Sequence, residues 1–123
     1  MRVARLADSP RGPMDPTNFH GTVERRDFGT VESPPGTALA VSFEAGARTH
    51  WHRHPGGQVL YILEGEARVG VRDESAVELT AGDLVNTPPG EEHWHGAGPN
   101  GPMTHLAIQF GDTEWLGPVA AGD

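Results

Sequence analysis

Short runs in which apolar and polar residues alternate recur along this chain, and each run is closed by Gly, Pro, Asp or Asn. They cover residues 37–46, 58–71, 76–88 and 103–110. A period of two is typical of strands, because successive side chains point to opposite faces. No segment shows a helical period beyond a turn or two. With 17 glycines and 11 prolines available for turns, the pattern predicts an all-β fold, either an antiparallel sandwich or a closed barrel.

The length of 123 residues fits one domain that buries one core. We expect the barrel to span residues 19–111. Residues 1–18 contain three prolines and few periodic apolar positions, which predicts an extended arm. Residues 112–123 form an acidic tail whose apolar anchor is Trp115-Leu116. We expect Trp115 and the arm to dock on a neighbouring barrel, which predicts a homodimer.

Composition excludes several classes of function. The chain has 17 acidic and 9 basic residues, a net charge of -8, which disfavours nucleic acid and anionic membranes as partners. It has no cysteine, so a metal site must use imidazole and oxygen donors. No apolar run has the length of a signal peptide or a membrane span. We therefore expect a cytoplasmic protein that binds a small molecule.

Five of the seven histidines occur in two clusters, at 50–54 and 93–95, with a spacing of two residues. On a strand this spacing places His52 and His54 on one face, and Gln58 returns to the same interior after a Pro-Gly-Gly turn. The second cluster can supply a third imidazole from a separate strand. Three imidazoles and one amide oxygen make a divalent-metal site with open positions. Exposed histidine pairs without function are the competing interpretation.

The wider pattern is more specific than the histidines alone. Gly46, His52-x-His54, Gln58 and Gly65, followed by Gly82-Asp83, Pro89-Gly90 and His93, resemble the two signature motifs of the cupin superfamily across residues 37–110. The resemblance implies a cupin barrel (a double-stranded β-helix, or jelly roll) and the metal ligands His52, His54, Gln58 and His93. Gln58 replaces the usual glutamate, so the metal keeps its full charge, which favours Lewis-acid chemistry.

A closer resemblance concerns the segments FEAGARTHWHRHPGGQ, PPGEEHWHGA and MTHLAIQ. They are similar to the small manganese cupins with hydroxynitrile lyase activity. That likeness implies one divalent ion, manganese first, although the donors also accept iron, nickel, zinc and cobalt. It implies catalytic roles for His105 and Thr49. The residues implied to line the substrate pocket are Gln109, Leu39 and Val41. Strand parity supports part of this, because His105 and Gln109 share one face.

The expected reaction is cleavage or synthesis of a cyanohydrin, in which His105, steered by Thr49, takes or returns the proton. Three alternatives use the same ligands: a cupin dioxygenase, a polyketide-cyclase-like enzyme, and a non-enzymatic cupin that binds a metal or a small ligand. His50 falls outside the signature and is expected at the cavity rim or on the surface. Trp51 and Trp94 have the opposite parity from the ligands, so we expect them to point away from the metal.

Overall fold

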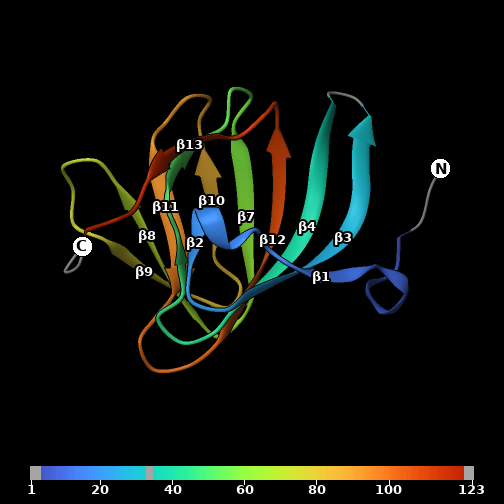
Figure 1. The fold of residues 1–123 in the computed structure, drawn as a ribbon, viewed down its shortest axis with the longest axis horizontal. Coiled ribbons are helices and arrows are strands. Elements are labelled where there is room, and N and C mark those ends of the chain that lie inside the picture. The colour runs from blue at the N-terminus through green and yellow to red at the C-terminus, as the bar shows by residue number, and fades with distance from the viewer. Residues whose placement is uncertain (1–3, 33–34, 121–123) are drawn as a thin grey trace.

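A computed structural model describes residues 4–32 and 35–120 of the chain. The first three residues of the predicted arm and the last three of the predicted tail lie outside the described residues. The described part forms strands and two 3-10 helices, η1 (Leu6–Asp8) and η2 (Pro16–Asn18). Figure 1 shows β3, β4, β12 and β7 running side by side. This is the all-β architecture that the alternating runs predict.

Six strands form the first sheet, in the order β1-β3-β4-β12-β7-β10. Their bounds are Arg11–Pro13 (β1), Val23–Glu32 (β3), Pro35–Phe43 (β4), Met103–Phe110 (β12), Gln58–Glu64 (β7) and Leu84–Thr87 (β10). Every pairing in this sheet is antiparallel, as in a hairpin or Greek-key barrel. The sheet places His105 opposite both Val41 of β4 and Ile62 of β7.

Seven strands form the second sheet. Their bounds are Phe19–His20 (β2), Arg48–Thr49 (β5), Trp51–Arg53 (β6), Glu66–Val71 (β8), Val77–Thr80 (β9), His93–Ala97 (β11) and Glu114–Gly117 (β13). β11 lies in the middle, paired with β5 and β6 on one side and with β8 on the other. All five residues of β11 are buried, so this strand carries its histidines deep inside the molecule.

The core lies between the two sheets, where apolar side chains of β4, β7, β8 and β12 meet. Phe43, Ile62, Ala67 and Met103 are each 1% exposed, which is the burial expected of inward-facing positions on alternating strands. The predicted turn at Gly65 joins β7 to β8 with a φ of 80°. A side chain there would collide with the backbone of Pro102, so the close approach also requires glycine.

Both ends of the chain pair with the barrel of their own chain. In the arm, β1 pairs with β3, and β2, directly after the arm, pairs with β5. In the tail, β13 pairs with β6. The Trp115 ring packs within its own chain, 5.5 Å from that of Phe19 and 4.8 Å from that of His52, and docking of Trp115 and the arm on a neighbouring barrel stays a prediction.

Trp51 and Trp94 occupy the outer side of the second sheet. They form a small cluster with Val119, against which Leu116 also packs. The guanidinium carbon of Arg72 lies 3.9 Å from the centre of the Trp51 ring, a cation-π contact. The two indoles thus point away from the histidines, as their parity predicts.

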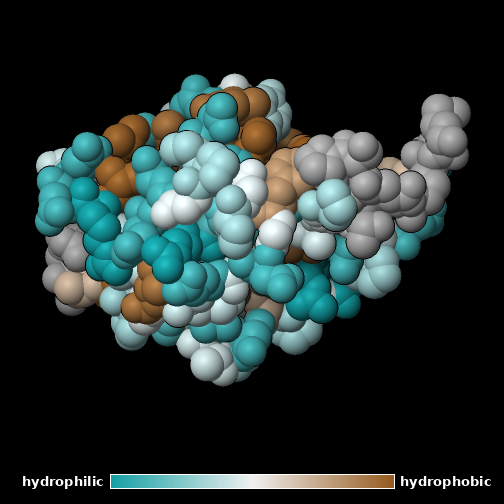
Figure 2. Space-filling model, turned by 90° about the horizontal axis from the view of Figure 1, so that it is seen from above, coloured by the Kyte–Doolittle hydropathy of each residue, from teal (hydrophilic) through white to brown (hydrophobic). Residues whose placement is uncertain are grey.

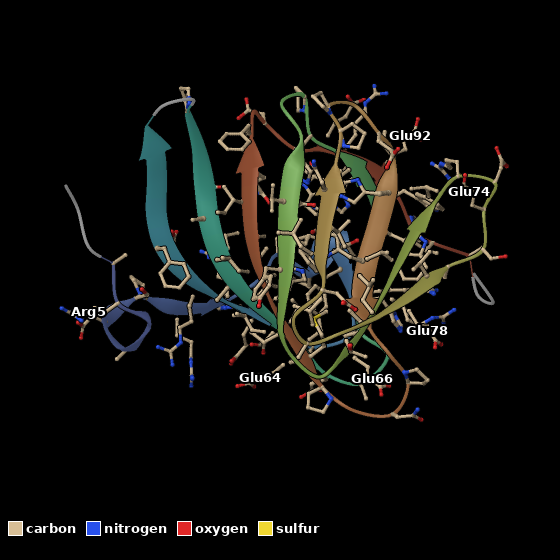
Figure 3. The ribbon with its side chains drawn as sticks, turned by 180° about the vertical axis from the view of Figure 1, so that it is seen from behind. Arg5, Glu64, Glu66, Glu74, Glu78 and Glu92 are labelled. Carbon is tan, nitrogen blue, oxygen red and sulfur yellow. The ribbon has the colours of Figure 1, made fainter. Side chains whose placement is uncertain are left out.

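The face of the molecule seen in Figure 2 is mostly hydrophilic, with apolar patches between polar ones. The labelled glutamates Glu64, Glu66, Glu74, Glu78 and Glu92 lie on the outside of the barrel (Figure 3). Tyr61, Leu63 and Leu84 are apolar residues with at least 39% exposure, and Tyr61 and Leu84 are direct neighbours across β7 and β10. They form an exposed apolar surface, and the homodimer stays a prediction. Among the described residues, no helix has the length and apolarity needed to cross a bilayer.

Candidate metal centre and active site

Three strands, and the segment that follows one of them, bring five histidines together inside the barrel. His52 lies on β6 and His54 directly after it, whereas His93 and His95 lie on β11 and His105 on β12. His52 and His93 are paired across β6 and β11, and their ring centres are 4.3 Å apart. The His54 ring lies 5.0 Å from that of His52 and 5.4 Å from that of His93. All five imidazoles are at most 5% exposed.

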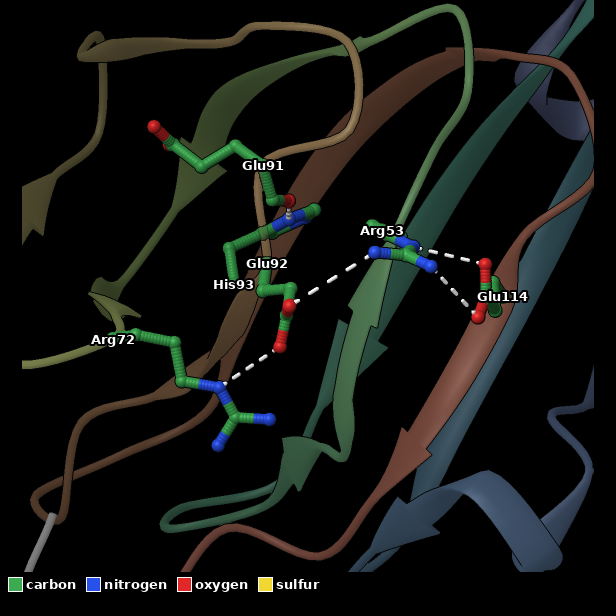
Figure 4. A network of polar contacts seen from close by, with 6 residues as sticks. All are labelled: Arg53, Arg72, Glu91, Glu92, His93 and Glu114. Atoms are coloured by element: carbon green, nitrogen blue, oxygen red, sulfur yellow. Dashed lines mark hydrogen bonds and ion pairs between the residues drawn. The ribbon is translucent and has the colours of Figure 1, made fainter.

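Hydrogen bonds fix the orientation of the three predicted imidazole ligands. His52 Nδ1 donates to the backbone oxygen of His50 over 2.8 Å, and His93 Nδ1 donates to that of Glu91 over 3.0 Å (Figure 4). A neutral imidazole that donates from Nδ1 keeps the lone pair on Nε2. His54 Nδ1 contacts the Thr113 hydroxyl at 3.1 Å, and its buried Nε2 has no partner among the described residues. Such partners orient a metal-binding histidine.

Gln58 places an oxygen beside these nitrogens. Its amide Nε2 donates to Gln109 Oε1 over 2.9 Å, which leaves Gln58 Oε1 at 3.0 Å from His93 Nε2. With the His93 proton on Nδ1, two lone pairs face each other there without a proton between them. A cation is the group that such a pair of acceptors accommodates. The residues present therefore fit a divalent metal.

Ring nitrogens of His52, His93 and His95 lie within 4.8 Å of one another, so these three residues could hold one metal ion. His54 is outside this group, and the ligand set His52, His54, Gln58 and His93 stays a prediction. His95 belongs to the same cluster, with its ring centre 5.1 Å from that of His52. Whether His95 can bind a metal depends on which ring nitrogen carries its proton. Its Nε2 offers a lone pair only when Nδ1 carries the hydrogen.

Burial keeps these imidazoles neutral. It lowers the pKa of His52 to about 2, assisted by the charge that His93 would carry. Burial lowers the pKa of His54 to about 4, again with a contribution from His93. The pKa of His93 is lowered for the same reason. Since a metal competes with protons for imidazole nitrogen, lowered pKa values prepare these side chains for coordination.

A second histidine pair adjoins the cluster. His105 Nε2 lies 3.0 Å from His95 Nδ1, and both residues are buried. Burial lowers the pKa of His105 to about 4 and holds that of His95 well below its ordinary value. His95 Nε2 and His105 Nδ1, the outer nitrogens of the pair, have no partner among the described residues. Thr49 Oγ1 accepts the backbone N–H of His95 over 3.2 Å. The hydroxyl proton of Thr49 is therefore free to donate elsewhere.

A cavity of about 40 Å³ adjoins this site. The predicted pocket and catalytic residues Leu39, Val41, Thr49, His105 and Gln109 all line it. His93 does not, and reaches the site through Gln58. His50, half-buried, contributes its carbonyl oxygen rather than its ring. A larger cavity, about 760 Å³, lies over Trp51 and Trp94 on the outer side, and its described lining includes no histidine.

Sequence reasoning missed several groups at this site, among them His95, Phe19, Thr113 and Trp115. His95 has the same parity as His93 and stands two residues away, which is a usable signal for a second inward imidazole. Phe19 comes from directly after the arm, and Thr113 and Trp115 come from the tail. Their contact with the site depends on pairings with β5 and β6, and their local sequence does not predict these pairings.

Two antiparallel sheets that enclose a buried group of neutral imidazoles define a β-barrel protein with a candidate metal centre. Residues 39–109 match the family model described as Cupin domain, and the chain belongs to the cupin family. It is 43% identical over 112 residues, 89% of this chain and 84% of the relative, to an (R)-mandelonitrile lyase of Granulicella tundricola.

Solved structures give the same result for the fold. A cupin-like protein of Thermotoga maritima superposes with a TM-score of 0.84 at 39% identity, over 91% of this chain and 90% of the other. A polyketide cyclase of Streptomyces resistomycificus superposes with a TM-score of 0.77 at 17% identity, over 100% and 88% of the two chains. At that identity the second likeness concerns the fold alone.

Proposed function

We propose that this protein is a metal-dependent enzyme that cleaves or forms cyanohydrins, as a hydroxynitrile lyase does. The observation that carries the proposal is the buried His95–His105 pair beside the candidate metal centre. It provides a proton acceptor and a proton donor next to a place where a substrate oxygen can bind. The relative named as a mandelonitrile lyase, similar along most of both chains, supports the same reaction.

We propose His52, His54, Gln58 and His93 as the ligands, with His95 as a further imidazole beside them, and Mn²⁺ as the metal. A bound divalent ion would act as a Lewis acid that stabilises negative charge on an oxygen or on cyanide. All these donors are neutral, so no carboxylate would offset the charge of the ion. This feature distinguishes the site from one with a glutamate at position 58 and favours an anionic product such as cyanide.

The residues around the cavity would handle the proton. In cleavage, the O–H and C–CN bonds break, a carbonyl forms, and cyanide leaves with a proton as hydrogen cyanide. One proton lies in the hydrogen bond between His95 Nδ1 and His105 Nε2. When the outer nitrogen of one ring takes up a proton, this shared proton can shift and the outer nitrogen of the other ring can release one. Thr49, whose oxygen already accepts the His95 amide, is free to donate its hydroxyl proton to the substrate oxygen. His105 thus acts through His95, with Thr49 orienting the substrate.

The test is cyanide release from mandelonitrile and from acetone cyanohydrin by protein loaded with Mn²⁺. We expect activity that depends on the metal, and a loss of roughly 10²- to 10⁴-fold in kcat for His105→Ala or His95→Ala, the usual range for a general acid-base group. The exposed His20 provides the control, because His20→Ala removes an imidazole of the same protein that faces solvent.

The metal content of every variant is measured alongside activity, so that a lost ion is not mistaken for a lost proton acceptor. Fully Mn²⁺-loaded protein that cleaves neither aromatic nor aliphatic cyanohydrins would contradict the proposal. Oxygen uptake by the iron- and nickel-loaded forms, measured with the same preparations, would instead support the dioxygenase alternative.

A further inference from the structure

The cavity beside the histidines is too small for most cyanohydrins in the form described above. Its volume is about 40 Å³, whereas an engineered cavity that binds benzene measures on the order of 150 Å³ and a single water needs about 10–15 Å³. The cavity therefore holds a few water molecules or an ion of two or three atoms. A larger molecule must displace part of the wall.

One part of the wall differs from the rest. Six of the residues that line the cavity belong to the long strands β4, β7 and β12, each bonded to a strand on both sides. Phe19 and Trp115 come instead from β2, of two residues, and β13, of four. Each of these strands pairs with only one neighbour, β5 and β6 respectively. Short strands at a sheet edge are the elements that open at the lowest cost in free energy.

The two aromatic rings line the cavity together. Phe19 is registered opposite Thr49 on β5, and Trp115 opposite His52 on β6. The rings meet edge to face, with centres 5.5 Å apart and planes at 60°, a favoured geometry for an aromatic pair. The Trp115 ring also lies 4.8 Å from that of His52. The aromatic pair is thus the neighbour, across the strands, of Thr49 and of a proposed metal ligand.

The pairing of β13 has two further features that bear on movement. Its register with β6 shifts between Trp115 and Gly117, so the strand is irregular next to the tryptophan. One of its side-chain attachments is the bidentate pair in which Arg53 donates to Glu114 over 2.9 and 3.0 Å (Figure 4). Both side chains of this pair are more than a third exposed, so water weakens the attachment.

We propose that Phe19 and Trp115 form an aromatic gate that sets the size of the molecule reaching the histidines. The gate favours small aliphatic hydroxynitriles and carbonyl compounds, and it disfavours substrates with an aryl group, which require Trp115 to move. This inference rests on the proposed function for the identity of the substrate. The selection by size is a property of the cavity and is tested separately.

The test follows ligands of increasing size as they bind to protein loaded with Co²⁺, whose visible absorption reports new ligands at the metal. The probes are azide, acetate and benzoate. In the unaltered protein we expect affinity to fall with size, with benzoate weakest. Trp115→Ala should increase benzoate affinity by roughly tenfold or more, the scale of steric discrimination in apolar pockets, while azide affinity changes less than twofold.

Two further variants make the result specific. Phe19→Ala removes the other half of the gate and should produce the same preference, which keeps the test decisive if Trp115→Ala does not fold. Tyr61→Ala removes an aromatic ring that is 39% exposed on the outer face of the first sheet and should leave all three affinities unchanged. If the protein takes up no Co²⁺, imidazole resonances recorded by NMR without metal report ligand entry in the same variants.

The outcomes separate the two proposals. Benzoate binding equal in the unaltered protein and in both gate variants, or azide and benzoate weakened together, would overturn the gate. Size-dependent binding without any cyanohydrin cleavage would retain the gate and reject the lyase. Where cleavage occurs, Trp115→Ala should raise kcat/KM for mandelonitrile relative to acetone cyanohydrin, chiefly through KM.

Discussion

Gln109 shows how one side chain controls another at this site. Its Oε1 accepts from Gln58 Nε2, and this hydrogen bond turns the Gln58 oxygen toward His93 Nε2. The oxygen and the NH₂ group of an amide have similar sizes, so the Gln58 side chain fits in two orientations. Its hydrogen-bond partner Gln109 decides which of them is present. Gln109 was expected as a pocket-lining residue, and it does line the cavity, but this second contact gives it a positioning role.

We therefore predict that Gln109→Leu lowers the affinity for Mn²⁺ or Zn²⁺ by roughly 10- to 100-fold, the usual effect of removing a group that orients a metal ligand. Isothermal titration of the metal-free protein measures it. Asn86, an exposed amide on β10, supplies the control, because Asn86→Leu removes an amide that faces solvent. Unchanged affinity in Gln109→Leu would mean that Gln58 needs no partner to face the metal.

At the scale of elements, β13 lies at the edge of its sheet and has an exposed attachment. Besides backbone pairing with β6 and the packing of Trp115, it is held by the exposed Arg53–Glu114 pair. We predict that Glu114→Gln increases amide hydrogen exchange in residues 114–117 while the melting temperature changes little, because an exposed ion pair contributes little to global stability. Exchange followed by mass spectrometry measures it.

Glu78→Gln, on the outer edge strand β9, serves as the control with the same change of charge. Exchange in β13 that stays as slow as in the unaltered protein would show that backbone pairing alone holds the strand. In that case the aromatic gate would need a cause of motion other than a weak anchor.

The same elements show what a sequence can and cannot predict. Alternation identified the runs that became β4, β7, β8 and β12, because each has one face in the core and one outside. Parity likewise placed Trp51 and Trp94 away from the histidines. The short strands β2 and β13 carry no such signal, since two to four residues show no period. Their places are fixed by partners 28 or more positions away along the chain.

The buried histidines make the whole molecule sensitive to acid. Burial lowers the pKa of His52 to about 2 and those of His54 and His105 to about 4, from an ordinary value of 6.5. As pH falls below 6.5 the unfolded chain takes up protons that the folded protein does not. Their contribution to stability is therefore complete above pH 6.5 and is lost as the pH falls from there towards 4.

Each such histidine should reduce the free energy of unfolding by about 1.4 kcal/mol per pH unit within that interval. Urea unfolding of the metal-free protein at several values between pH 7 and pH 4.5 measures the slope. His105→Leu should have a shallower slope, by about one proton, because it removes a buried group that stays neutral when folded. Saturating metal should steepen the dependence, since protons must also displace the ion from the nitrogens. A free energy of unfolding that stays constant over this range would show that the imidazoles take up protons without unfolding, and that the cluster is more open to water than its burial indicates.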